Sequence, residues 1–306
     1  MRVATDIGGT FTDLVAVNEH GETIMRKSHT TPPDFEQGVI DVIRKGGVDA
    51  AGIADFIHGT TTIINALTER KGAKTALITT KGFRDVLEIA RGTRPDLFNL
   101  VFAKPRPFVP RHLRGEVTER VSYDGKIETE LNEDDVKAAV MEFKNEGVEA
   151  VAVCLINSYA NSTHEIRIKE LIGELWPNVS VTASVDITKE WREYERTSTT
   201  VLNAYVMPRA SSYIDKLDTK LSGLGCLGNK YIMQSNGGTN TFSHAKLTPV
   251  NMVESGPVAG VYGAAILGRM IGEKNVIAFD IGGTTAKCSL VDDGQVKITT
   301  EYRDGK

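Results

Sequence analysis

The sequence predicts an α/β protein made of two related halves, and two observations support this fold class. The first is a repeat: residues 3–17 return as residues 277–291 with the same Asp-Ile-Gly-Gly-Thr core. The second is the alternation of apolar strand patterns with helix patterns at the spacings of an α/β fold. Because the two copies are separated by a domain's length, we expect each copy to open its own half.

Each copy of the repeat reads as an apolar strand, a tight Gly-Gly turn and a second strand. Glycines allow the chain to reverse and let bare amides approach a ligand. The Asp at the end of the first strand offers a carboxylate to a metal, and the Thr hydroxyls can donate to oxygens. A single Gly-Gly hairpin is usually only a hairpin, but two such copies favour a cradle for phosphate and Mg²⁺.

Length and composition limit the class of protein. The 306 residues are 41% hydrophobic and 25% charged, which is typical of a soluble globular protein with two domains. A net charge of −4 gives no electrostatic case for binding nucleic acid or an anionic membrane. No run of transmembrane length or signal peptide is recognised, so we expect a cytoplasmic protein. Its cysteines, Cys154, Cys226 and Cys288, are expected to be reduced and buried.

The first predicted domain covers residues 1–184. Its expected strands are the first hairpin and residues 22–27, 55–58, 74–79, 150–156 and 180–183. Its expected helices follow Asp34 as far as residue 45 and cover residues 63–71, 81–88, 134–145 and 164–175. The segment 91–114, rich in Arg and Pro, is either a functional or interface loop or simply a solvated face.

The second predicted domain covers residues 185–306. A helix that follows Trp191 is expected to run to residue 206 and to stop at Pro208, before another helix over 211–221. A strand over 231–234 should then end in a turn at 236–238. A helix over 258–271 leads into the second hairpin, and a final strand is expected over 296–302.

Two Asp-Gly-Gly-Thr hairpins, each opening an α/β half, resemble the actin-like ATPase superfold, also described as ribonuclease H-like. That resemblance implies a nucleotide between the halves, held at its phosphates by the two turns. It also implies that Asp6 and Asp280 act on Mg²⁺ or Mn²⁺ through water. The residues implied to bind the nucleotide are Gly8, Gly9, Thr10, Thr12, Gly256, Gly282, Gly283, Thr284 and Thr285. Lys287 either neutralises phosphate charge or is an ordinary exposed strand lysine.

Several further blocks resemble the hydantoinase A/oxoprolinase family, which also includes subunits of ATP-dependent ketone carboxylases. The blocks begin at Asp6, His58, Gly82, Arg91, Glu190 and Glu254, and they read DIGGTFTD, HGTTTIIN, GFRD, RGTRPD, EWREYERT and ESGPVAG. The resemblance covers essentially the whole chain. Members of this family are longer than 306 residues, so it implies a fragment whose second half is incomplete.

The resemblance implies a hydrolase that uses ATP and Mg²⁺ to phosphorylate a carbonyl oxygen and so open a cyclic amide such as 5-oxoproline or a hydantoin. The first alternative is a subunit of an acetone- or acetophenone-type ketone carboxylase. An alternative from another class is a nucleotide-binding regulatory module that transforms no substrate. The implied partners are a cyclic amide or ketone substrate, a hydantoinase B-type subunit and further copies in an oligomer.

The predicted catalytic residues are Asp6, Thr10, His58 and Asp280. The residues predicted to face the substrate or the γ-phosphate are His58, Gly59, Thr60, Thr61, Asn65, Arg91 and Arg94. The first four of these lie between a strand and a helix, where free amides favour an anion. For His58 the alternative is a buried histidine whose hydrogen bonds are satisfied. Asn65 and Glu69 are expected to share one helix face, and the two arginines bind an anion or decorate the loop.

Residues 192–196 carry two arginines and two glutamates at helical spacing. They are either ion pairs on a helix surface or part of a cleft or domain junction, and the family resemblance favours the second interpretation. Gly256 is expected to permit a close approach of nucleotide or backbone.

Overall fold

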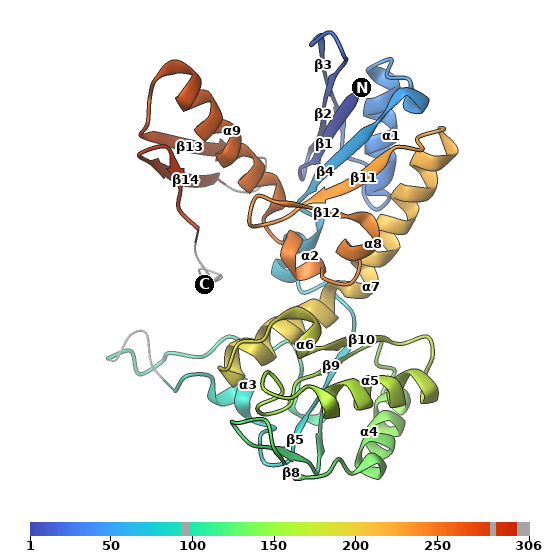
Figure 1. Cartoon of the computed structure of the whole chain (residues 1–306), viewed down its shortest axis with the longest axis vertical. Coiled ribbons are helices and arrows are strands. Elements are labelled where there is room, and N and C mark those ends of the chain that lie inside the picture. Colours follow the sequence, from blue (N-terminus) through green and yellow to red (C-terminus); the bar gives the residue numbers. More distant parts are fainter. Residues whose placement is uncertain (93–97, 282–285, 299–306) are drawn as a thin grey trace. The chain divides into compact units, whose positions relative to one another are not determined.

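The computed structural model describes residues 1–92, 98–281 and 286–298 of the chain. These residues form two compact units (Figure 1). Unit 1 combines Met1–Thr68 with Ala210–Lys306, and unit 2 is Glu69–Arg209. The predicted boundary between residues 184 and 185 does not coincide with the limits of these units and stays a prediction.

Unit 1 is built on a six-stranded sheet with the order β12-β11-β4-β1-β2-β3. Its strands are β1 (Arg2–Ile7), β2 (Phe11–Val17), β3 (Thr23–His29), β4 (Asp55–Thr60), β11 (Asn229–Met233) and β12 (Thr239–Thr241). Its helices are α1 (Phe35–Lys45), η1 (Ala50–Gly52), α2 (Thr62–Thr68), α8 (Phe242–Ala245), η3 (Pro249–Met252), α9 (Ser255–Ile271) and the last part of α7 (Glu193–Gly223). A separate sheet holds β13 (Val276–Ile281), β14 (Ala286–Asp292) and β15 (Gln295–Val296).

The first predicted hairpin forms the centre of the six-stranded sheet. β1 and β2 pair antiparallel with Asp6 opposite Asp13, and β4 runs parallel to β1 with Gly59 opposite Asp6. Alternate residues of the hairpin, Val3, Ile7, Leu14 and Ala16, are buried. This alternation is expected for strands with one face on a core, and it fixes the register that places Asp6 beside Gly59.

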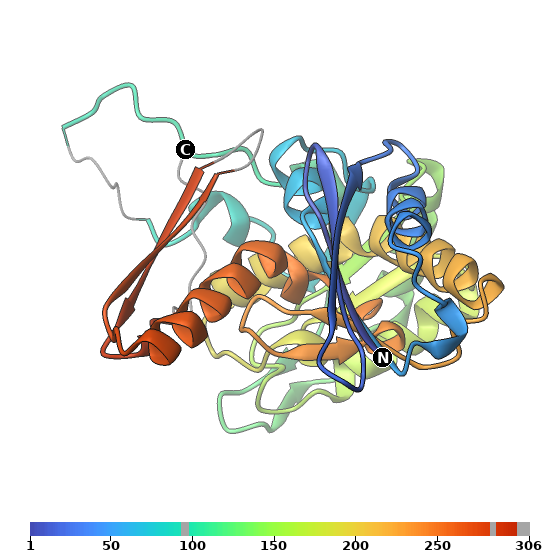
Figure 2. The same ribbon diagram turned by 90° about the horizontal axis from the view of Figure 1, so that it is seen from above.

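The second predicted hairpin repeats this pairing in a different setting (Figure 2). β13 and β14 pair antiparallel with Asp280 opposite Lys287, and α9 packs beside them. The apolar side chains of Ile277, Phe279, Ile281 and Leu290 are each more than half exposed. The repeat in the sequence therefore produces the same local hairpin twice, but only the first copy is embedded in a core.

Unit 2 has a four-stranded parallel sheet with the order β10-β9-β5-β6. Its strands are β5 (Thr75–Thr80), β6 (Arg114–Val117), β7 (Arg120–Val121), β8 (Ile127–Thr129), β9 (Ala150–Val153) and β10 (Ser180–Ala183). Its helices are α3 (Val86–Ile89), η2 (Arg111–Leu113), α4 (Glu133–Asn145), α5 (Thr163–Leu175), α6 (Ser184–Ile187) and the first part of α7.

The core of unit 2 lies around its two central strands. Every residue of β5 and β9 is buried, which explains their continuous apolar runs. α4 and α5 pack on each other and cover the sheet (Figure 1), and Val201 and Ala204 of α7 join the same core. The predicted strands and long helices of this region are confirmed to within a few residues.

The predicted break at Pro208 is wrong, because α7 continues through it as one helix of 31 residues. Proline removes one backbone hydrogen bond and normally costs about 3 kcal/mol in a helix interior. Two features offset that cost. The amide that Pro208 lacks would have bonded to the Ala204 carbonyl, and the next carbonyl along the helix, that of Tyr205, accepts a hydrogen bond from the Ala73 amide at 2.9 Å. Ile214 and Leu217 are fully buried beyond the proline.

Four smaller predictions are also corrected. α3 covers only four residues, where a helix over 81–88 was expected. α2 ends at Thr68, so Asn65 and Glu69 do not share a helix face. Asp34 precedes α1 as predicted, but its side chain makes no capping hydrogen bond. The final strand lies at Gln295–Val296 rather than over 296–302, of which residues 299–302 lie outside the described part.

Candidate functional site

Asp6 is held in a cradle of two glycines that are almost two hundred residues apart in the sequence. Gly59 of β4 and Gly256 of α9 both lie against its carboxylate. A Cβ atom at Gly59 would stand 2.7 Å from Asp6 Oδ1, and one at Gly256 would stand 2.8 Å from the same oxygen. Since real Cβ atoms do not come this close, a side chain at either position would have to displace the Asp6 carboxylate.

The cradle leaves one carboxylate oxygen buried without a donor. Asp6 Oδ1 has no hydrogen-bond partner within the described residues. Burial raises the pKa of Asp6 from 3.8 to about 6, with further increases from Asp13 and Asp280 and an opposing effect of Lys287. A buried, unpartnered carboxylate is costly unless a cation or donor joins it, so this oxygen fits the role of a metal-side ligand.

The second hairpin contributes charges near this carboxylate. Asp280 is exposed, and Lys287 forms an ion pair with Glu254, which directly precedes α9. Lys287 is therefore neither a free phosphate ligand nor an ordinary exposed lysine. The remaining predicted residues of this turn, Gly282, Gly283, Thr284 and Thr285, lie outside the described residues.

This donor set fits Mg²⁺ better than a dedicated metal cage. The described part of the chain contains no cluster of three or more His, Cys, Asp or Glu side chains able to hold a metal. Mg²⁺ usually takes one or two carboxylates, keeps several waters and completes its shell with substrate phosphates. Asp6, assisted by Asp280, meets that requirement.

The first Gly-Gly turn presents open donors. Gly9 and Thr10 are exposed, and the Thr10 hydroxyl has no hydrogen-bond partner within the described residues. Thr30 supports the turn: its amide donates to the Thr10 carbonyl and its hydroxyl to the Gly8 carbonyl, each at 2.9 Å. Only the pairing of β2 with β3 brings Thr30 here, so sequence analysis did not find it.

Thr12 does not fulfil its predicted role at the phosphates. Its side chain is fully buried, and a Cβ at Gly38 of α1 would lie 2.9 Å from its hydroxyl. The hydroxyl lies 3.4 Å from that of Thr30. The side chain therefore packs between the hairpin and α1, because it occupies the inward-facing position of β2.

His58 is placed as the alternative interpretation expected. Its ring is fully buried and hydrogen-bonded to the Thr5 hydroxyl at 2.8 Å and to the Tyr213 hydroxyl at 2.6 Å. Burial lowers the pKa of His58 to about 3, so the ring is neutral at physiological pH. Both ring nitrogens are occupied by hydroxyls of the protein, so the neutral ring helps to position β4.

Ser255 joins the start of α9 to the end of β4 and was missed from the sequence. Its hydroxyl donates to the Thr60 carbonyl at 3.0 Å and accepts from the Thr60 amide at 3.3 Å. Thr60 is buried, and Thr61 is half-buried with its hydroxyl bonded to the Ile7 carbonyl. These bonds hold Gly256 against Asp6. Asn65, half-buried on α2, has no side-chain hydrogen bond within the described residues.

The predicted arginines belong to unit 2. Arg91 pairs with Glu195, and Arg94 lies outside the described residues. Arg196 is fully buried and donates to the backbone carbonyls of Glu190 and Leu155, so the interpretation of this block as surface ion pairs is wrong for Arg196. The structure of unit 2 explains Arg196 as a buried anchor of α7.

The cysteines partly match the prediction. All three are free thiols, and Cys154 and Cys226 are buried. Cys288 is exposed on β14, because the second hairpin is not covered. The expectation that all three are buried is therefore wrong for Cys288.

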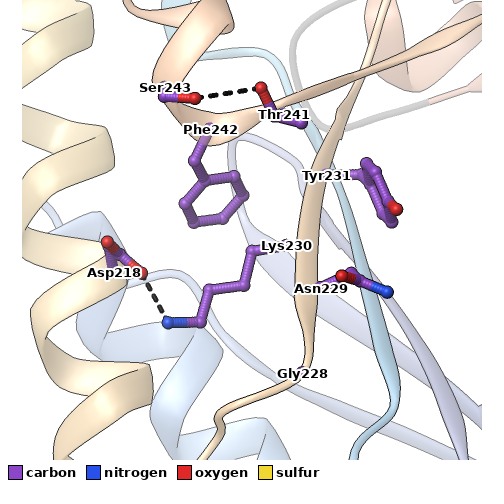
Figure 3. Close-up of a pocket in the computed structure, with 8 residues that line it drawn as sticks. All are labelled: Asp218, Gly228, Asn229, Lys230, Tyr231, Thr241, Phe242 and Ser243. Carbon is purple, nitrogen blue, oxygen red and sulfur yellow. Dashed lines mark hydrogen bonds and ion pairs between the residues drawn. The ribbon is translucent and has the colours of Figure 1, made fainter.

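Unit 1 also has a cavity of about 300 Å³ between α7 and the β11–β12 hairpin (Figure 3). It contains none of the predicted site residues. The Lys230 amine, the one lining cation among the residues drawn, is bound to Asp218 and Ser222. Because the charge of Lys230 is already paired, we do not consider this cavity a second candidate for the nucleotide-binding site.

Comparisons with known proteins consistently identify one protein family. Residues 2–176 match the model of the hydantoinase/oxoprolinase N-terminal region, and residues 196–306 match that of hydantoinase/oxoprolinase. The chain is 41% identical to an uncharacterised protein of Methanocaldococcus jannaschii, over 99% of this chain and 45% of that protein. It is 33% identical to the caprolactamase subunit alpha of Pseudomonas jessenii, over 98% of this chain and 44% of that subunit.

A solved structure is also similar. The nucleotide-free structure of acetone carboxylase, from work on the mechanism of ATP-dependent acetone carboxylation, matches with a TM-score of 0.87 and 28% identity. The match covers 96% of this chain and 44% of that one. The predicted actin-like ATPase type of α/β fold is confirmed. The chain spans less than half the length of the relatives it matches. Within the described residues, no helix is both long and apolar enough to cross a bilayer.

Proposed function

Because this chain belongs to the hydantoinase/oxoprolinase family, we propose that it forms the nucleotide-binding part of an ATP-dependent enzyme that opens a cyclic amide. One observation carries the proposal. Within the described residues, Asp6 keeps a buried oxygen without a donor, in a cradle where a side chain at Gly59 or Gly256 would displace its carboxylate. A structural carboxylate would be hydrogen-bonded, whereas a carboxylate that awaits a cation is arranged in this way.

Each residue then has a defined task. Asp6, with Asp280, holds Mg²⁺ or Mn²⁺, and the turn offers the amides of Gly9 and Thr10 and the Thr10 hydroxyl to phosphate oxygens. The Gly8 amide closes the turn instead, since it donates to the Phe11 carbonyl at 2.9 Å. When bound, ATP supplies a phosphoryl group to the carbonyl oxygen of the amide, which makes the ring bond easier to open. Catalysis by the chain itself is mostly positioning and charge stabilisation.

Residues that do not contact the proposed ligands help to hold the Asp6 cradle in shape. Ser255 ties Gly256 to β4, and His58 with Tyr213 holds the opposite face of that strand. These residues keep Asp6 in place, so their substitution should lower turnover without abolishing the affinity for a cyclic amide. Gly282, Gly283, Thr284, Thr285 and Arg94 keep their predicted roles as ligands of nucleotide or substrate.

The alternative is a subunit of an ATP-dependent ketone carboxylase. The similarity to the acetone carboxylase structure favours it, since the same cradle can activate a ketone oxygen. The caprolactamase relative is named as a subunit, so we also propose a hydantoinase B-type partner for this chain.

The test is ADP release from the complete protein with any partner subunit, supplied with Mg-ATP. Oxoproline, hydantoin and caprolactam form one arm, and acetone or acetophenone with bicarbonate forms the other. We expect a cyclic amide to raise ADP release at least about tenfold. Stimulation only by ketone plus bicarbonate would replace this proposal with the carboxylase, and turnover indifferent to both arms would indicate a regulatory module.

A further inference from the structure

Unit 2 contains a cavity of about 600 Å³ that the proposed nucleotide site does not use. It lies beside Thr75, the first residue of β5, and all of its lining residues belong to unit 2. Cavities of this volume commonly hold a small molecule. Its lining includes aromatic and basic side chains and one closely packed glycine: Arg70, Gly72, Lys74, Phe108, His112 and Tyr205.

One wall of the cavity is formed by two closely packed aromatic rings. The rings of Phe108 and Tyr205 lie 4.8 Å apart at an angle of 64°. A Cβ at Gly72 would lie 2.1 Å from the Tyr205 ring, so this position requires glycine. The two rings meet edge to face, so the wall offers an angled apolar surface whose shape is fixed by this packing.

Arg70 is held over this wall in an unusual conformation. Its guanidinium lies 4.5 Å from the centre of the Phe108 ring and donates to the Arg106 carbonyl at 2.6 Å. Its backbone has φ of 51°, which is costly for a residue other than glycine. Within the described part of the chain, no carboxylate pairs with it. The chain thus accepts backbone strain to fix an unpaired cation beside a cavity.

Two further polar groups in the cavity are open to a ligand. Tyr205 is 7% exposed, and its hydroxyl has no hydrogen-bond partner within residues 1–92, 98–281 and 286–298. The same holds for the His112 ring. By contrast, the Lys74 amine pairs with Glu146, and the Glu149 carboxylate, which also lines the cavity, accepts from the Lys74 amide at 2.9 Å. The Arg70 guanidinium, which has donors left beyond its bond to the Arg106 carbonyl, and the Tyr205 phenol together can donate to an anion.

We propose that this cavity binds a small oxyanion, with its carboxylate or phosphate group at Arg70 and Tyr205 and its apolar body along the wall formed by Phe108 and Tyr205. The binding would occur within unit 2 and would require neither ATP nor Asp6. It is therefore independent of the proposed function.

Titration calorimetry with benzoate tests the proposal, with phenyl phosphate as a second arm and benzamide as the neutral control. We expect saturable binding at one site, at least about tenfold weaker for benzamide because the charged hydrogen bonds are lost. Comparison of benzoate with phenyl phosphate identifies which oxyanion the site prefers.

Variants locate the site. Arg70→Gln should weaken binding about tenfold or more, and Tyr205→Phe, which keeps the ring, should weaken it about three- to tenfold. Lys71→Gln is the matched control, since Lys71 pairs with Glu69 and does not line the cavity; its affinity should stay within about twofold. Equal affinity in Arg70→Gln and Lys71→Gln, with both folded by circular dichroism, would overturn the proposal. So would a failure of benzoate and phenyl phosphate to saturate.

Discussion

The first and second hairpins share the Asp-Ile-Gly-Gly-Thr pattern but have different surroundings. Around the first, β4 and α9 bring Gly59 and Gly256 against Asp6, and Ile7 is 1% exposed. Around the second, Asp280 is exposed, and Ile281, the counterpart of Ile7, is 68% exposed. The motif therefore specifies the local hairpin, whereas the surroundings of its aspartate depend on residues that are distant in the sequence.

The largest expected effect concerns the cradle of the first hairpin. Gly256→Ala places a methyl group 2.8 Å from Asp6 Oδ1 and must displace the carboxylate. We expect ATP turnover to fall about 100-fold, because an error of roughly 1 Å can cost that much. ADP release by the purified variant measures it.

Gly260→Ala is the matched control, since Gly260 also lies on α9 and a Cβ there meets nothing within 4 Å. It should keep its turnover and gain helix stability of about 0.5–1 kcal/mol. Equal turnover in both variants would mean that the cradle is unimportant and the two hairpins are equivalent.

The next effect is on stability and compares equivalent isoleucines. Ile7→Ala should lower the free energy of unfolding by about 2–5 kcal/mol, because it leaves a cavity in the sheet core. Ile281→Ala should change it by less than about 0.5 kcal/mol, as is usual for an exposed site. Urea denaturation of the 306-residue chain measures both. Similar losses would show that the second hairpin is also packed in a core.

The pH dependence of stability sharpens the comparison of the two aspartates. The folded-state pKa of Asp6 is about 6 against an ordinary 3.8, so the folded state binds more protons between these values. The contribution of Asp6 to stability should therefore fall as the pH rises from about 4 to about 6, by on the order of 3 kcal/mol. The lowered pKa of His58 acts in the opposite direction over the same range, so the Asp6 contribution is the difference between the natural chain and a variant that lacks this carboxylate.

Urea midpoints measured across the pH range should show that Asp6→Asn gains stability relative to the natural chain as the pH rises from about 4 to about 6. Asp280→Asn should change this pH dependence only slightly, because burial is the main cause of the Asp6 shift. The same pH dependence in Asp6→Asn and the natural chain would contradict the raised pKa of Asp6.

The smallest effect concerns Thr12, whose counterpart in the second hairpin is Ala286. Thr12→Ala should cost about 1 kcal/mol of stability, through a lost buried hydroxyl and methyl, with turnover within about twofold of the natural chain. Loss of turnover without loss of stability would restore Thr12 as a phosphate ligand.

Much of the fold could be predicted because local patterns determine it. The alternation of apolar residues located both hairpins, and the apolar runs located β5 and β9. Pro208 was misread because propensity alone argues for a break. The bond from Ala73 to Tyr205 and the buried side chains beyond the proline keep the helix intact, and no local pattern reveals them.

The site was only partly predictable for the same reason. Asp6 and Gly256 were identified, but their contact joins residues that are distant in the chain. Thr12 and His58 are residue types suited to phosphate binding or acid–base chemistry, which is why the sequence suggested them. In the structure both side chains lie on the buried face of their strands, and the sequence did not reveal that position. Ser255 lies in the block that begins at Glu254, but nothing in that block shows that its hydroxyl bonds to Thr60, and no local pattern marks Thr30.

The most direct test of the account is ATP turnover in Asp6→Asn and Asp280→Asn, measured as ADP release by the complete protein with its substrate. The account predicts a loss of about 100-fold or more in Asp6→Asn and a clear loss in Asp280→Asn, with both variants folded. Turnover like that of the natural protein in Asp6→Asn would contradict the claim that this buried carboxylate is the metal-side ligand of the nucleotide.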